Sequence, residues 1–153
     1  LRRKFVKTSI LAGIATLSEV ALATPLMWRP LHNLGELICK CGCGECNMDK
    51  DFMVRLEKMR EEWYSQSNRI LKVNSGYRCK SHNLHVSRFA HKDGSGPHTM
   101  GKAIDIAISG KDAGVLYKIA KKYMTGIGIS KRFIHMDSLT SAEAPRPTVW
   151  RYN

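Results

Sequence analysis

Two segments of the chain carry apolar residues at helical spacing. In the first, over about 51–66, these residues recur three or four positions apart: Phe52, Leu56, Met59 and Trp63. The spacing predicts a helix whose apolar stripe faces a core, and Asn47 or Asp49 is placed to cap its first turn. A second helix is predicted over 111–124, with apolar residues inward and lysines outward: Val115, Ile119 and Ala120 against Lys118, Lys121 and Lys122.

Other segments alternate apolar and polar residues with a period of two, which is typical of strands. The strand predicted over 102–108 places Asp105 on a face of small residues, with isoleucines on the opposite face. The strand predicted over 133–137 places His135 and Asp137 together on one face. Further elements are expected elsewhere: strands over 70–74 and 126–129 and a short helix over about 81–88. We predict an α+β fold with a small, mainly antiparallel sheet and helices on one side.

Two side chains from these strands and one from the turn before the first strand form a candidate metal site: Asp105, His135 and His98. Each motif alone has an ordinary explanation, because edge aspartates and surface histidines are common. Strand interiors disfavour aspartate, yet two aspartates lie in apolar strands here, each with a histidine nearby. The two motifs together favour zinc held by two imidazoles and a carboxylate, with a fourth position for water. Other histidines lie outside any strand pattern and are not assigned as ligands: His82, His85 and His91.

Four motifs in order along the chain, over roughly 33–153, resemble those of the zinc D-Ala-D-Ala carboxypeptidases and murein endopeptidases. The first is the segment Ser75-Gly76-Tyr77-Arg78, followed by Asn83. The second matches the family's spacing of histidine, glycine, alanine and aspartate: His98, Gly101, Ala103 and Asp105. The last two are the segment Phe133-Ile134-His135-Met136-Asp137 and a tail that contains Arg146-Pro147 and Trp150. These last motifs resemble the branch of the family that ends in His-x-Asp. The resemblance implies an α+β fold like that of hedgehog and D,D-peptidase domains.

The resemblance implies a zinc peptidase that hydrolyses peptide bonds involving D-amino acids in bacterial peptidoglycan, as a D,D-carboxypeptidase or an endopeptidase of the endolysin kind. It implies that Asp137 is the catalytic base and that Arg78 binds the oxyanion or a substrate carboxylate. Tyr77, Asn83 and Trp150 become the expected substrate contacts. The chain departs from the family pattern at Gly96, where serine is usual, and at Arg132, where the better-known branch has glutamate.

The net charge of +12 indicates an anionic partner or surface. The peptide stems of an acidic cell wall fit this charge, and with that substrate no nucleic acid is expected as a partner. Two other classes stay open: a zinc-bearing cell-wall binding module without catalysis, and a basic, cysteine-rich nucleic-acid-binding protein. We expect a monomer. No transmembrane span is expected, because no apolar run reaches the roughly 18 residues that a span requires.

The N-terminal residues are typical of an export signal. A basic start, Leu1–Lys7, precedes a mostly apolar run, and Ala21-Leu22-Ala23 offers a cleavage site. The pair Arg2-Arg3 resembles the twin-arginine export motif, whereas Glu19 interrupts the apolar run and leaves an amphipathic helix as the alternative. We therefore expect an exported protein of the periplasm or cell envelope, and one interpretation gives it a phage or prophage origin. The chain is expected to have three parts: an export signal over 1–23, an approach segment over 24–50 and a zinc peptidase domain over 51–153.

Four of the five cysteines fall within eight residues: Cys39, Cys41, Cys43 and Cys46. Export favours disulfides, although cysteines at this alternating spacing cannot all pair with each other without strain. A small structural metal site is the second interpretation, and free thiols are the third. An odd number of cysteines leaves at least one thiol over, and Cys79 is a further candidate for pairing with the cluster.

Overall fold

The computed structural model of the protein describes residues 34–152. The export signal predicted over 1–23 and the first part of the approach segment lie outside these residues. The elements follow in order: a 3-10 turn η2 (Leu34–Glu36), α1 (Lys50–Ser67), β1 (Lys72–Ser75), α2 (Lys80–Val86), β2 (Ala103–Ala107), α3 (Gly110–Ala120), β3 (Gly126–Ile129), β4 (Phe133–Asp137) and β5 (Thr148–Arg151). Among these residues, no helix is both long and apolar enough to cross a membrane.

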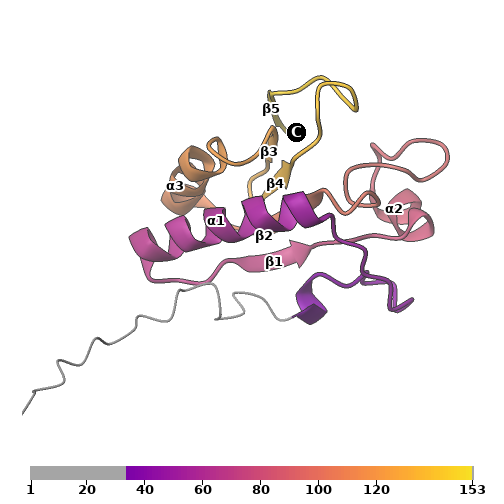
Figure 1. The fold of residues 1–153 in the computed structure, drawn as a ribbon, viewed down its shortest axis with the longest axis horizontal. Coiled ribbons are helices and arrows are strands. Elements are labelled where there is room, and N and C mark those ends of the chain that lie inside the picture. Colours follow the sequence, from indigo (N-terminus) through magenta and orange to yellow (C-terminus); the bar gives the residue numbers. More distant parts are fainter. Residues whose placement is uncertain (1–33, 153) are drawn as a thin grey trace, which may run out of the picture.

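The strands form a single five-stranded sheet in the order β1-β2-β4-β3-β5. Every neighbouring pair is antiparallel except β3 and β5, which run parallel. Figure 1 shows α1 and α3 lying beside each other along the sheet, whereas α2 lies at its far end. The predicted α+β class with a mainly antiparallel sheet is therefore confirmed. The tail beyond residue 147 adds an edge strand to the sheet, which the sequence pattern did not predict.

Helix α1 forms as the apolar spacing predicted. The Asp49 side chain caps it by accepting a hydrogen bond of 2.8 Å from the Phe52 N–H, and Asn68 ends it in the left-handed conformation (φ 52°). Helix α3 ends at Ala120, before the predicted end at residue 124. The chain tightens there, because the N–H groups of Lys122 and Tyr123 bond carbonyls three residues back, and this turn leads into β3.

One face of the sheet packs against α1 and α3 to form the core. The residues that meet there are apolar and buried: Phe52, Leu56, Met59, Trp63, Ile104, Ile106, Leu116, Ile119, Ile127, Ile134 and Met136. Leu37 from the N-terminal segment joins the same cluster, with 1% of its surface exposed. The 3-10 turn is thus tied to the body of the domain by its neighbour Leu37, and it lies against β1.

The opposite face of the sheet carries the polar residues, and the strand register aligns them in a row. Asp105 lies opposite Ser75 on β1 and His135 on β4, and His135 in turn lies opposite Gly128 on β3. Gly128 lies beside Trp150 on β5, which completes the row across all five strands. Because side chains alternate between faces along a strand, this row shares the face that the core does not use.

We expect the core to respond strongly to loss of volume at Leu56 on α1. The Leu56 side chain is completely buried, so Leu56→Ala leaves a cavity and lowers the free energy of unfolding by about 2–5 kcal/mol. Val54, two residues earlier on the same helix, is 55% exposed, and Val54→Ala is expected to change the free energy of unfolding by less than about 0.5 kcal/mol. Urea unfolding followed by circular dichroism measures both; equal effects would contradict this assignment of the core face.

Candidate metal centre and active site

The structure brings His98, Asp105 and His135 together on the polar face of the sheet. Asp105 and His135 come from the paired strands β2 and β4, and His98 comes from the turn that precedes β2. The His98 Nε2 atom lies 3.2 Å from His135 Nδ1 and 3.3 Å from Asp105 Oδ1, and the last two atoms are 2.8 Å apart. Three potential donor atoms from three segments therefore converge on one point.

This triangle of donors fits a zinc ion. In tetrahedral zinc sites the bonds to nitrogen and oxygen are about 2.0–2.2 Å, which places neighbouring donors about 3.3–3.5 Å apart. The two distances from His98 Nε2 are close to this spacing, whereas His135 Nδ1 and Asp105 Oδ1, at 2.8 Å, would move apart to share an ion. Two imidazoles and one carboxylate are a donor set that zinc accepts and that leaves a fourth position open. All three residues are more than nine-tenths buried, and burial lowers the pKa of His98. The His98 ring is therefore neutral at pH 7, which is the form that binds metal.

Hydrogen bonds outside the triangle fix the direction of the donors. The Nδ1 atom of His98 lies 2.7 Å from the Gly76 carbonyl, which accepts its proton and leaves the Nε2 lone pair aimed at the centre. A side chain at Gly76 would not fit, because its Cβ would lie 2.7 Å from the Leu37 Cα atom. The motif Ser75-Gly76-Tyr77-Arg78 thus supports the centre through its backbone as well as through its side chains.

Arg78 holds the other oxygen of the Asp105 carboxylate. Its Nη2 atom forms an ion pair with Asp105 Oδ2, which leaves Oδ1 to face the two histidines. The guanidinium is itself held by Ser75 Oγ at 2.8 Å and by Asn83 Oδ1 at 3.5 Å. Burial acts to raise the pKa of Asp105, but the facing His98 and His135 rings hold it below the ordinary value. Asp105 is therefore ionised at neutral pH.

Asp137 lies behind His135, on the side away from the triangle. Its carboxylate is completely buried, with Oδ2 3.4 Å from His135 Nε2. Arg146 binds both oxygens, through Nε at 2.9 Å and Nη2 at 2.6 Å, and the Leu139 N–H donates to Oδ1 at 3.1 Å. Burial acts to raise the pKa of Asp137, but hydrogen bonds from His135 and Arg146 lower it to about 2. This placement suits a carboxylate that orients an imidazole.

Two glycines on β3 leave the space that these contacts need. A Cβ at Gly126 would lie 2.3 Å from Asp137 Oδ2 and 2.5 Å from Arg146 Nε, so any side chain would displace the ion pair. A Cβ at Gly128 would lie 2.6 Å from the Trp150 ring. Trp150 can therefore lie over the strand, with its ring centre 5.5 Å from that of His135. The Gly-x-Gly pattern of β3 is a packing requirement of the site.

Two cavities adjoin the donor triangle. One, of about 330 Å³, is lined by Asn83, His135, Arg146, Trp150 and Tyr152 among others. The other, of about 390 Å³, is lined by Arg78, Arg88, Phe89, His98, Asp105 and His135 among others. The open side of the centre is thus bordered by aromatic rings and by guanidinium groups.

The residues expected from sequence to contact substrate occupy different places. Asn83 and Trp150 line the first cavity, whereas Tyr77 lies away from both, with its hydroxyl 3.3 Å from Glu45 Oε2. The sequence interpretation missed Tyr152, which lines both cavities, because β5 was not recognised as a strand. The period-two pairing of Trp150 with Tyr152 was the available signal.

Comparison with known families gives one match that covers most of the chain. The family described as Peptidase M15 matches residues 32–137, which include all three donors and the Ser75–Arg78 motif. A search of curated proteins finds no match.

We predict that loss of Arg146 destabilises the protein, because it leaves a buried carboxylate unpaired. Arg146→Met is expected to lower the free energy of unfolding by about 3–5 kcal/mol. Arg151→Met removes an exposed charge from β5, which follows Arg146 in the same C-terminal tail, and should change the free energy of unfolding by less than about 0.5 kcal/mol. Adding Asp137→Asn to Arg146→Met should recover part of the loss. Urea unfolding of the four proteins, each free of added metal, makes the comparison, and a loss shared equally by both arginine variants would refute it.

Proposed function

The chain belongs to the Peptidase M15 family of zinc peptidases, and from this premise we propose that it hydrolyses peptide bonds involving D-amino acids in bacterial peptidoglycan. We assign His98, Asp105 and His135 as the residues that hold the zinc ion. The observation that carries the proposal is the triangle of buried donor atoms, within 4.8 Å of one another, at the position where the family motifs fall.

A zinc ion bound there supplies a Lewis acid and lowers the pKa of its water from about 15.7 towards about 7. The protein contributes the arrangement around it. Arg78 holds Asp105 so that one carboxylate oxygen faces the centre, and the Gly76 carbonyl sets the ring of His98. We assign Asp137 a positioning role, in place of the base role that the resemblance implied. A base must reach the proton that it removes, whereas Asp137 is enclosed by Arg146 and the back of His135.

The walls of the two cavities support a peptide substrate that carries carboxylates. Phe89, Trp150 and Tyr152 offer apolar surface for a stem peptide, and Arg88 lines the cavity that contains the donor triangle. Arg88 is exposed and contacts the Phe89 ring, and among the described residues it pairs with no carboxylate. The net charge of +12 suits an acidic wall. We therefore propose that the protein acts in the cell envelope.

One observation favours a second candidate, a zinc-bearing module that binds the cell wall without cleaving it. Asp105 is the only carboxylate among the residues that line the two cavities, and it already belongs to the donor triangle. Arg132 stands where the better-known branch of the family has glutamate. Product formation separates the two candidates directly.

We predict that zinc-loaded protein releases soluble fragments from peptidoglycan sacculi and that a chelator abolishes the release. His98→Ala should lose both bound zinc and activity, because one of three donors is missing. His91→Ala, which changes an exposed loop histidine, should keep both. Mass spectrometry of the fragments identifies the bond that is cut. Zinc binding without any product would favour the binding module, and release that persists in chelator would refute the zinc mechanism.

Asp137→Asn tests the positioning role against the base role. As a positioning residue, Asp137 affects zinc affinity, so the variant should bind zinc about 10–100-fold more weakly. At saturating zinc its kcat should then stay close to that of the unchanged protein. Loss of a general base would instead lower kcat by about 10²–10⁴-fold even when the site is full. Zinc titration with a competing chelator, together with kcat at saturating zinc, distinguishes these outcomes.

A further inference from the structure

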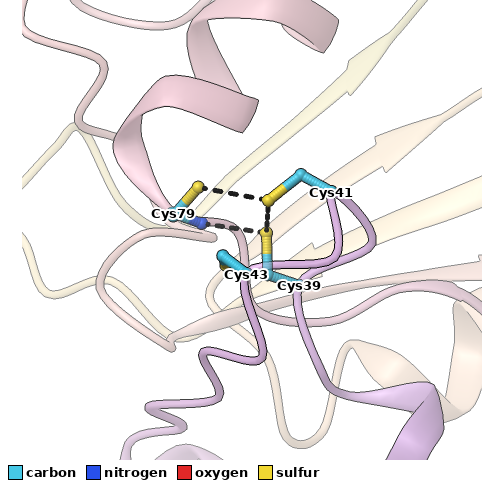
Figure 2. A group of neighbouring side chains, drawn as sticks. All are labelled: Cys39, Cys41, Cys43 and Cys79. Atoms are coloured by element: carbon cyan, nitrogen blue, oxygen red, sulfur yellow. Dashed lines mark hydrogen bonds between the residues drawn. The ribbon is translucent and has the colours of Figure 1, made fainter.

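A second group of potential metal ligands lies in the described residues, away from the donor triangle. The Sγ atoms of Cys39, Cys41, Cys43 and Cys79 all lie within 4.8 Å of one another. The first three come from the N-terminal loop, and Cys79 comes from the residue before α2 (Figure 2). Cys46, the remaining cysteine, is exposed and does not belong to this group.

The spacing of the sulfur atoms suits a tetrahedral ion. Zinc–sulfur bonds of about 2.3 Å place neighbouring sulfurs about 3.8 Å apart. The Cys39 and Cys41 sulfurs are 3.4 Å apart, and the Cys41 and Cys79 sulfurs are 3.7 Å apart. The Cys41 sulfur thus lies at similar distances from two other sulfur atoms. Coordination of one ion by four sulfurs requires this arrangement, whereas a disulfide between two cysteines does not. None of the five cysteines is bonded to another.

The surroundings of the cluster resemble those that stabilise metal-bound thiolates. The Cys79 N–H points at Cys39 Sγ at 3.3 Å, and the His82 N–H points at Cys79 Sγ at 3.4 Å. The His82 ring contributes its Nδ1 atom 3.2 Å from Cys39 Sγ. Such donors around the sulfurs tune and orient the ligands of metal sites. His82, which the sequence pattern does not assign as a ligand of the first site, lies beside this second group.

The backbone of the N-terminal loop is built to turn three cysteines towards one side. The Cys39 N–H bonds the Glu45 carbonyl at 2.8 Å and closes the loop. Gly42 and Gly44 adopt positive φ angles of 88° and 77°, which a residue with a Cβ rarely takes. The Cys-x-Cys-Gly-Cys-Gly sequence thus forms a curled loop, and Figure 2 shows the Cys39 and Cys41 sulfurs turned towards Cys79.

We propose that Cys39, Cys41, Cys43 and Cys79 together bind one zinc ion as a structural site, separate from the His98–Asp105–His135 centre. Binding converts four thiols to four zinc-bound thiolates and releases four protons to solvent. The ion replaces repulsion between the thiolates with attraction to a shared cation. It also links the N-terminal loop, through its sulfur–zinc coordinate bonds, to the segment that contains Arg78.

The link to Arg78 gives the structural ion a role in the catalytic centre. Cys79 directly follows Arg78, whose guanidinium holds Asp105. The same segment is also held by the N-terminal residues, through the Tyr77 N–H, which bonds the Leu37 carbonyl at 2.9 Å. Clamping Cys79 to the loop therefore restrains the turn that sets the Asp105 carboxylate.

Metal content tests the proposal independently of peptidase activity. Protein purified under reducing conditions should contain two zinc ions per chain. His98→Ala should keep one, and so should Cys41→Ser, which changes an exposed ligand. Cys46→Ser is the matched control, because it removes an exposed cysteine outside the group, and it should keep two. Equal zinc content in the two cysteine variants would overturn the proposal.

Cobalt identifies the ligands of the remaining ion. His98→Ala protein loaded with cobalt should absorb in the near ultraviolet through charge transfer from thiolate to cobalt, and adding Cys41→Ser should weaken or abolish that absorption. A mercurial reagent added to zinc-loaded His98→Ala protein should release one zinc equivalent as the thiols react, which needs no cysteine substitution. Absence of the absorption or of the released zinc overturns the proposal, as does a Cys41–Cys79 disulfide in protein that binds no zinc. Failure of these tests leaves the His98 centre, and the proposed function, unaffected.

Discussion

The shared Asp105 carboxylate is the interaction on which the site depends. One oxygen faces His98 and His135, and the other pairs with Arg78. The carboxylate therefore connects the turn before α2, the turn before β2 and the central strand pair. A buried carboxylate is costly unless it is paired, and here burial and pairing occur together. Arg78 satisfies one oxygen permanently, and the charge of the other is available to a cation at the donor triangle.

A second constraint comes from the strand register. Asp105, His135, Gly128 and Trp150 form one row, and Asp137 and Gly126 lie opposite each other in the next. In each row a glycine on β3 lies beside a functional residue on β4, and the vacant space receives a large side chain from the C-terminal tail. The tail thus completes the site from outside the matched family region, because Arg146 and Trp150 both follow residue 137. The rear support of His135 and one wall of the first cavity both come from this tail.

Local sequence patterns were sufficient for the elements that carry the donors. Period-two alternation placed Asp105 and His135 on the face away from the core, and helical spacing gave the buried stripe of α1. The structure adds what pattern alone cannot supply. The alternation that pairs His135 with Asp137 says nothing of Arg146, whose position depends on the path of the tail. It therefore could not distinguish a carboxylate open to substrate from one buried behind an imidazole.

The cysteines illustrate the same limit. Their spacing left disulfide, metal site and free thiols open, because the position of Cys79 relative to the loop depends on how residues 34–46 pack. Leu37 anchors that segment in the core, and the anchor brings the loop to the start of α2. Tertiary contacts, rather than the motif, decide which four sulfurs meet.

The central claim is that three side chains hold one zinc ion, and anomalous diffraction at the zinc absorption edge tests it most directly. In crystals of the zinc-loaded protein we predict an anomalous peak about 2.0–2.2 Å from His98 Nε2, Asp105 Oδ1 and His135 Nδ1. Absence of a peak at this triangle, or an ion bound by only one of the three residues, would contradict the account.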